Sequence, residues 1–200
     1  MQPVTTFEGR MAPLRRSNVD TDQIIPAVYL KRITKSGYED ALFANWRQDP
    51  NFVLNQPQYQ GVSVLVAGSD FGTGSSREHA VWALRDYGFA AVFSPKFGDI
   101  FRGNCGKMGV IAGVISESTA EELMRIAETI PDSLVEIDLP AQQIRIGDKQ
   151  FGFEIDEYTK WRLIEGLDDI GITLQNEEKI TEFERRRESW RPKTLPAKGV

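Results

Sequence analysis

The sequence has one cysteine and one histidine in 200 residues, and each scarcity excludes a class of site. Cys105 cannot form an intrachain disulfide, and one thiolate cannot ligate an iron-sulfur cluster, which needs several. With His79 as the single histidine, we expect no metal site and no bound cofactor built by this chain alone.

Long apolar runs and clustered positive charge are also missing. No apolar run approaches the roughly 18 residues of a membrane span, and the opening MQPVTTFEGR lacks the features of a secretory signal, so we expect a cytoplasmic protein. The 24 basic and 29 acidic residues give a net charge of −5, and the basic residues are scattered. This pattern disfavours nucleic-acid and membrane partners and favours a small ligand.

The remaining composition, 40% apolar and 26% charged, fits a globular chain with one core. Strand and helix signals alternate without internal repeats, which predicts an α/β layered domain with a mixed sheet. The apolar 61–68 predicts a strand buried on both faces, and 75–88 predicts a helix ending at Gly88. Segment 15–32 is expected to be a loop.

Other predicted elements follow the same rules of periodicity and capping. Ser118 and Glu121 have capping-box spacing at the start of one helix, and Gly147-Asp148 marks a hairpin turn. The expected strands are 90–94, 110–115, 133–139 and both arms of 142–155, the expected helices are 118–130, 157–166 and 173–190, 97–109 is a short helix or loop, and 191–200 is a disordered tail.

The most informative segment is GSDFGTGSSREHA (68–80), which joins a buried strand to a helix. Gly72 and Gly74 permit unusual backbone angles, and the first helical N–H groups favour a negative ligand. Arg77 is mildly unfavourable at a helix N-terminus, which points to compensation by a bound anion or a neighbouring carboxylate. A guanidinium can hold a carboxylate through two hydrogen bonds.

A purely structural interpretation of this segment stays open. Ser75 and Glu78 have capping-box spacing, which alone would explain both residues. His79 fits equally well as a half-exposed histidine on the first helical turn. Dinucleotide and P-loop motifs do not match, because the six-residue window from Gly72 ends in Arg77 and no Gly-Lys-Ser/Thr follows.

Two further segments carry candidate polar groups. In NVDTDQIIP (18–26), Asp20 and Asp22 flank Thr21 before a rigid Ile-Ile-Pro, although an ordinary Asx turn would also explain them. The glycines of KFGDIFRGNCGKMG (96–109) bring backbone near a ligand, or simply form a tight loop. Its polar candidates are Arg102, Asn104 and Lys107.

DTDQIIP (20–26), GSDFGTGSSREHA and FGDIFRGN (97–104), in this order and spacing, resemble the 3-isopropylmalate dehydratase small subunits, a family related to aconitase. The resemblance is strong over about 14–115, weak over the hairpin, and absent after about 175. It implies a single swivelling-type layered β/β/α domain over 1–175, followed by a charged C-terminal helix and flexible tail over 176–200.

The resemblance also implies a division of labour between two chains in a heterodimer. A large subunit would carry a [4Fe-4S] cluster, while Ser75 of this chain would be the base that removes a proton from carbon. Arg77 would clamp a substrate carboxylate with Ser76, and Asp22 would border the pocket. The supporting residues would be Gly72, Gly74, Glu78 and His79.

The resemblance places substrate discrimination in the segment 27–37. Tyr29 and Leu30 would accept an isopropyl group, and either Lys31 or Arg32 would reach a carboxylate. The implied activity is a hydro-lyase step of leucine biosynthesis that interconverts 2-isopropylmalate and 3-isopropylmalate. The same chemistry on homoaconitate or methylmalate, and a non-catalytic phosphate- or nucleotide-binding module, are the alternatives.

Overall fold

The computed structural model describes residues 1–188 and 190–191. The chain divides into two compact units, Met1–Leu167 and Asp168–Val200. The boundary that the sequence analysis places at 175 stays a prediction.

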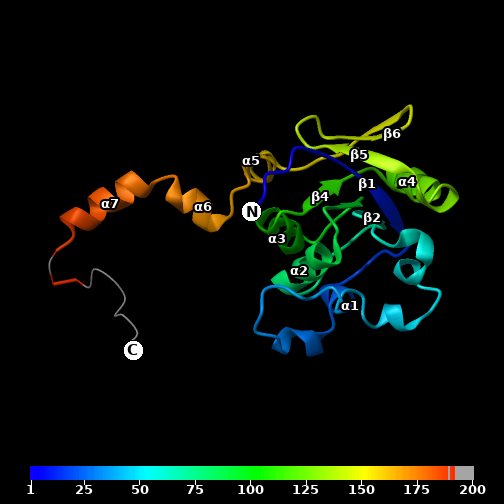
Figure 1. Ribbon diagram of the computed structural model, residues 1–200, viewed down its shortest axis with the longest axis horizontal. Coiled ribbons are helices and arrows are strands. Elements are labelled where there is room, and N and C mark those ends of the chain that lie inside the picture. The colour runs from blue at the N-terminus through cyan, green and yellow to red at the C-terminus, as the bar shows by residue number, and fades with distance from the viewer. Residues whose placement is uncertain (189, 192–200) are drawn as a thin grey trace. The chain divides into compact units, whose positions relative to one another are not determined.

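The first unit contains a seven-stranded sheet with strand order β4-β3-β2-β1-β5-β6-β7 (Figure 1). The strands from β4 to β1 pair in parallel, whereas those from β1 to β7 pair antiparallel, which confirms the predicted mixed sheet. The bounds are β1 Thr6–Leu14, β2 Val64–Ala67, β3 Ala91–Ser94, β4 Ile111–Val114, β5 Leu134–Asp138, β6 Gln143–Ile146 and β7 Lys149–Gly152.

Strand β1, which the sequence analysis did not predict, lies where the sheet changes from parallel to antiparallel pairing. Its sequence lacks apolar alternation and contains Gly9 and Pro13, which are unfavourable within strands. Met11 is nevertheless in register with Val64 of β2, and Gly9 with Val135 of β5. Pairing on both edges therefore makes this segment a strand.

Helices cover both faces of the sheet. Leu65 and Ala67 of β2 pack in one buried cluster with α2 and α3, while Val64 and Val66 pack with α4 in a second cluster. Complete burial of such a side chain contributes about 1.5–3 kcal/mol. The helices of this unit are α1 Thr21–Ile24, α2 Glu78–Tyr87, α3 Asp99–Met108, α4 Glu117–Thr129 and α5 Glu157–Glu165.

The N-termini of two helices differ from the capping predictions. Helix α2 begins at Glu78 without a side-chain cap, so the capping box of Ser75 and Glu78 is wrong. Helix α4 is capped by Ser116, whose hydroxyl accepts a hydrogen bond from the Thr119 N–H at 3.0 Å, and not by Ser118. Helix α2 ends at Gly88 with a φ of 115°, as predicted.

The segment 15–32, expected to be a loop, contains short helices. The Asp20 carboxylate accepts from the Gln23 N–H at 2.8 Å, and the Gln23 side chain accepts from the Asp20 N–H at 2.9 Å. This capping box starts α1, so Asp20 has a structural role. Single-turn helices follow at Ala27–Lys31, Trp46–Gln48, Val53–Asn55 and Pro57–Tyr59.

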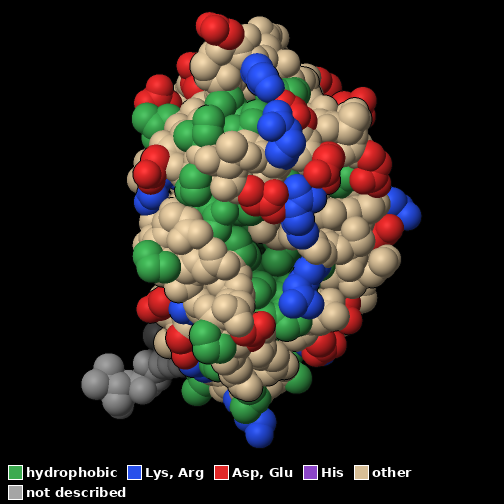
Figure 2. Space-filling view, turned by 90° about the vertical axis from the view of Figure 1, so that its right-hand side faces the viewer, with side chains coloured by type: hydrophobic (Ala, Val, Ile, Leu, Met, Phe, Trp, Pro, Cys, Tyr) green, Lys and Arg blue, Asp and Glu red, His purple; other side chains and the backbone are tan. Residues whose placement is uncertain are grey.

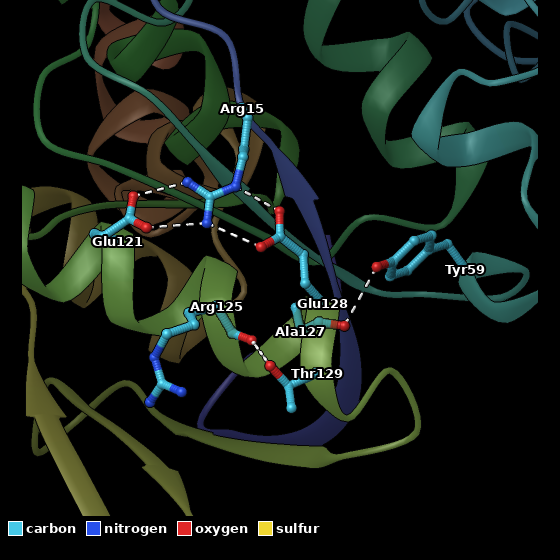
Figure 3. Close-up of polar contacts among 7 residues, drawn as sticks. All are labelled: Arg15, Tyr59, Glu121, Arg125, Ala127, Glu128 and Thr129. Carbon is cyan, nitrogen blue, oxygen red and sulfur yellow. Dashed lines mark hydrogen bonds and ion pairs between the residues drawn. The ribbon is translucent and has the colours of Figure 1, made fainter.

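Arg15, which directly follows β1, forms hydrogen bonds with two glutamates of α4 (Figure 3). Its guanidinium donates to both carboxylate oxygens of Glu121, at 2.8 and 3.0 Å, and to both of Glu128. These bonds raise the pKa of Arg15, Glu128 contributing most, and lower the pKa of the Glu121 carboxyl. The contacts fix the point at which the chain enters the candidate site.

The second unit contains α6, Asp169–Leu174, and α7, Glu177–Arg186. The single helix predicted over 173–190 is therefore wrong, because the helix breaks at 175–176. The expected tail over 191–200 lies outside the described residues except for Arg191. None of the helices in the described part of the chain has the length and apolar character needed to cross a membrane.

Candidate active site

The turn between β2 and α2, residues 68–77, runs beside the segment 18–22. The Asn18 N–H donates to the Ser69 carbonyl at 2.8 Å, and the Gly72 N–H donates to the Val19 carbonyl at 2.7 Å. The Thr21 N–H then donates to the Thr73 carbonyl at 2.9 Å. Two of the three predicted motifs thus lie together at the end of a parallel strand.

The glycines of this turn are required by its shape. Gly72 and Gly74 have φ angles of +75° and +92°, which side chains rarely adopt. A Cβ at Gly72 would lie 2.8 Å from the Phe101 Cβ and closer still to its ring. The third motif therefore reaches the turn through Phe101, whereas its polar candidates Arg102, Asn104 and Lys107 lie on α3.

Ser75 is exposed, and its hydroxyl oxygen lies 3.1 Å from the hydroxyl of Thr21. The Thr21 hydroxyl also lies 3.3 Å from the Ser75 carbonyl oxygen, and Thr21 itself is buried. The exposed Ser75 hydroxyl is thus in contact with a buried hydroxyl that can orient it. Sequence analysis did not assign this role to Thr21, although it lies between the two aspartates that drew attention to the segment.

Arg77 occupies the N-cap position of α2 and forms an ion pair with Asp22. The sequence analysis interpreted this cation as compensated by a bound anion or a neighbouring carboxylate, and the structure has the carboxylate of Asp22 there. The Asp22 side chain is 60% exposed and that of Arg77 23%, so the pair borders solvent. The Arg77 guanidinium is thus held in position beside a helix N-terminus with no side-chain cap, where negative charge is favoured.

Glu78 and His79 begin α2 directly after the turn. Glu78 carries negative charge in the first helical turn, where it is favourable. The His79 ring lies 4.4 Å from the Trp82 ring and 5.6 Å from the Tyr38 ring, centroid to centroid. His79 therefore belongs to an aromatic cluster that supports the turn. Ser76 is exposed beside Ser75.

The segment 27–37 presents exposed and half-buried apolar side chains. Tyr29 and Leu30 are half-buried against the core. Val28, which the sequence analysis did not single out, is 66% exposed. Lys31 is exposed, whereas the Arg32 guanidinium donates hydrogen bonds to Gly37 and to Asp40.

The described residues contain no group of three or more His, Cys, Asp or Glu side chains that could hold a metal ion. Cys105 is buried, and desolvation raises the pKa of its thiol. These residues do not fit an iron-sulfur cluster, whose ligands are several thiolates.

The side of the first unit that carries α4 shows a furrow with apolar side chains on its floor and Lys and Arg side chains along it (Figure 2). A groove of about 320 Å³ is lined by residues that include Leu14, Arg16, Phe52 and Tyr59. None of the predicted site residues lines this groove. The candidate site is instead an exposed turn.

Comparison with known proteins agrees with this description. Residues 1–118 match the aconitase C-terminal domain, 121–157 match LeuD_N, and 169–197 match the C-terminal domain of the 3-isopropylmalate dehydratase small subunit. The small subunit of 3-isopropylmalate dehydratase from Leifsonia xyli is 61% identical over 99% of this chain and 100% of its own length. That from Kocuria rhizophila is 61% identical over the full length of both chains.

A solved structure with lower sequence identity belongs to the same kind of protein. The crystal structure of 3-isopropylmalate dehydratase from Methanocaldococcus jannaschii has a TM-score of 0.66 and 27% identity. The match covers 88% of this chain and 98% of that one. The α/β swivelling-type fold implied by the three motifs is therefore confirmed, and the chain belongs to the family of 3-isopropylmalate dehydratase small subunits.

Proposed function

We propose that this chain supplies the proton-transferring half of a dehydratase that interconverts 2-isopropylmalate and 3-isopropylmalate in leucine biosynthesis. Family membership supports the hydro-lyase activity. The observation that supports the site is the exposed Ser75 hydroxyl, which Thr21 orients beside the Arg77–Asp22 pair. A cytoplasmic location stays an expectation from the sequence.

In the first half-reaction, the Ser75 alkoxide takes a proton from the substrate carbon next to a carboxylate, a carbon–carbon double bond forms, and the hydroxyl group leaves the neighbouring carbon as hydroxide. In the second half-reaction, Oγ returns the proton to that neighbouring carbon while hydroxide adds to the first carbon, which restores the alkoxide. An isolated serine alkoxide is too basic to exist at neutral pH, so nearby positive charge and N–H donors are needed. Arg77 and the uncapped start of α2 supply both.

Arg77 would bind one substrate carboxylate through its two-pronged guanidinium. Asp22 pairs with that guanidinium when substrate is absent, and it would border the pocket. Ser76 would donate to the same carboxylate. Gly72 and Gly74 set the path of the turn, because any other residue would be strained at their positive φ angles.

The partner is a large subunit, which the name of the small-subunit family implies. A [4Fe-4S] cluster held by that partner would supply Lewis-acid chemistry at the substrate hydroxyl. Exposure of Ser75 fits this arrangement, since an isolated half-site must stay open until the partner covers it. The isolated chain is therefore expected to be inactive.

Substrate choice is assigned to the segment 27–37, where exposed Val28 adjoins half-buried Tyr29 and Leu30. These side chains would contact the isopropyl group, and a smaller methyl substituent would leave part of that surface unfilled. One missing methylene in an apolar pocket costs about 1–3 kcal/mol of discrimination.

The test is a substrate panel assayed on the anaerobically purified complex with its large partner. We expect kcat/KM for 2-isopropylmalate to exceed that for 2-methylmalate by at least about tenfold, and homoaconitate to react more slowly still. A complex that prefers homoaconitate would overturn the substrate assignment. A complex inactive on every malate, although loaded with its cluster, would overturn the activity.

A further inference from the structure

The two adjacent cations of the substrate-discriminating segment have different environments. Lys31 is exposed and forms no ion pair within residues 1–188 and 190–191. The Arg32 guanidinium instead donates to both carboxylate oxygens of Asp40, at 2.7 and 2.6 Å, and to the Gly37 carbonyl at 2.6 Å. Arg32 thus closes the segment 32–40 into a loop.

Two aromatic rings hold the same guanidinium. The Arg32 Cζ lies 4.9 Å from the centroid of the Tyr29 ring and 5.6 Å from that of the Tyr38 ring. Tyr38 also donates its hydroxyl to the Thr34 carbonyl at 2.9 Å. Positive charge over aromatic faces is attractive, so these contacts add to the ion pair. Most of the donors of Arg32 are already used within the segment.

The loop closed by Arg32 is anchored to α2, the helix that begins at the catalytic turn. The Tyr38 N–H donates to the Asp86 carboxylate at 3.2 Å, and Arg85 donates to the Lys35 carbonyl at 2.9 Å. The buried Tyr38 ring also contacts His79 and lies 5.7 Å from the Trp82 ring. The segment that would meet the substrate's substituent therefore shares one support with the turn that carries Ser75.

We propose that Arg32 is a positioning residue for substrate specificity, acting through Asp40, and does not itself bind the substrate. By closing residues 32–40 against α2, it fixes the angle at which Val28 and Tyr29 are presented. The inference rests on the proposed function, because it assigns the discriminating surface to the same segment. Of the two basic residues that could contact a substrate carboxylate, the proposal therefore leaves Lys31.

A double-mutant cycle of Arg32→Lys and Asp40→Asn tests the proposal in the reconstituted complex. Lysine keeps the charge but loses the two-pronged geometry, and asparagine removes the carboxylate without approaching the substrate. We expect each variant to raise KM for 2-isopropylmalate about fivefold, with kcat changed less than about twofold. The double variant should resemble each single one, because both remove the same contact.

The exposed Lys35→Ala provides the matched control, since it removes a cation from the same segment without breaking an ion pair of the described residues. Its KM is expected to match the unmodified complex. A large defect in Arg32→Lys with normal kinetics in Asp40→Asn would show direct substrate binding by Arg32 and overturn the proposal. So would additive defects in the double variant.

A second readout separates this proposal from the proposed function. Amide hydrogen exchange needs no turnover, and it should speed up across 27–40 in Arg32→Lys and Asp40→Asn but not in Lys35→Ala. Unchanged exchange in the first two variants would overturn the proposal even if the enzyme is active. Inactivity of the unmodified complex on all malates would instead reject the proposed function while the exchange result still decides the closure of the loop.

Discussion

Substitution of Gly72 by alanine tests whether close packing sets the shape of the turn between β2 and α2. An L-residue at the positive φ of Gly72 costs about 1–2 kcal/mol. The new methyl group would also overlap the base of the Phe101 ring, and overpacking of this kind costs about 1–3 kcal/mol. The free energy of unfolding should therefore fall by about 2–5 kcal/mol.

Gly74→Ala is the matched control on the same turn. Its φ is also positive, but a Cβ there would lie 3.6 Å from its nearest neighbours, which is ordinary contact. Only the backbone cost of about 1–2 kcal/mol is expected. Equilibrium urea denaturation of the isolated chain would measure both variants. Equal losses at the two glycines, or no loss for Gly72→Ala, would refute the role of Phe101 in shaping the turn.

Two further predictions follow from named contacts. Thr21→Val keeps the buried shape but removes the hydroxyl beside Ser75, so kcat of the complex should fall by about tenfold while the thermal midpoint changes little; unaltered kcat would contradict this. Arg15→Met should lower the thermal midpoint at pH 7, and the gap from the unmodified chain should shrink as pH falls below about 4. The reason is that Arg15 lowers the pKa of the Glu121 carboxyl in the folded chain. The resulting stability is present above the pKa that Glu121 has in the unfolded chain, and it is lost as the pH falls through the lower pKa of the folded chain. A gap that does not depend on pH would argue against the contact.

Local signals predicted most of the regular structure. The α/β class, the hairpin turn at Gly147 and the helix end at Gly88 depend on residues close in sequence, and the structure confirms them. Strand β1 could not be predicted, because its pairing with strands more than 50 residues away determines its conformation. The cap of α4 was misplaced by two residues, because Ser116 and Ser118 are both serines and either can cap a helix.

The site was predictable as motifs but not as an arrangement. Asp22 and Arg77 could be selected from their segments, yet the ion pair between them spans 55 residues. The contact of Thr21 with Ser75 spans 54, and no periodicity reports it. Likewise, the sequence could not separate Lys31 from Arg32, because the hydrogen bonds that distinguish them depend on where the Asp40 carboxylate lies in the fold.

The proposed role of the Ser75 hydroxyl as proton carrier in dehydration and rehydration is tested most directly by the turnover of 2-isopropylmalate by the complex containing Ser75→Ala. Gel filtration checks that the two chains still bind each other. Removal of an essential base or nucleophile typically lowers kcat by more than about a thousandfold, and we expect such a loss with assembly intact. A variant that assembles and turns over at the rate of the unmodified complex would contradict the account.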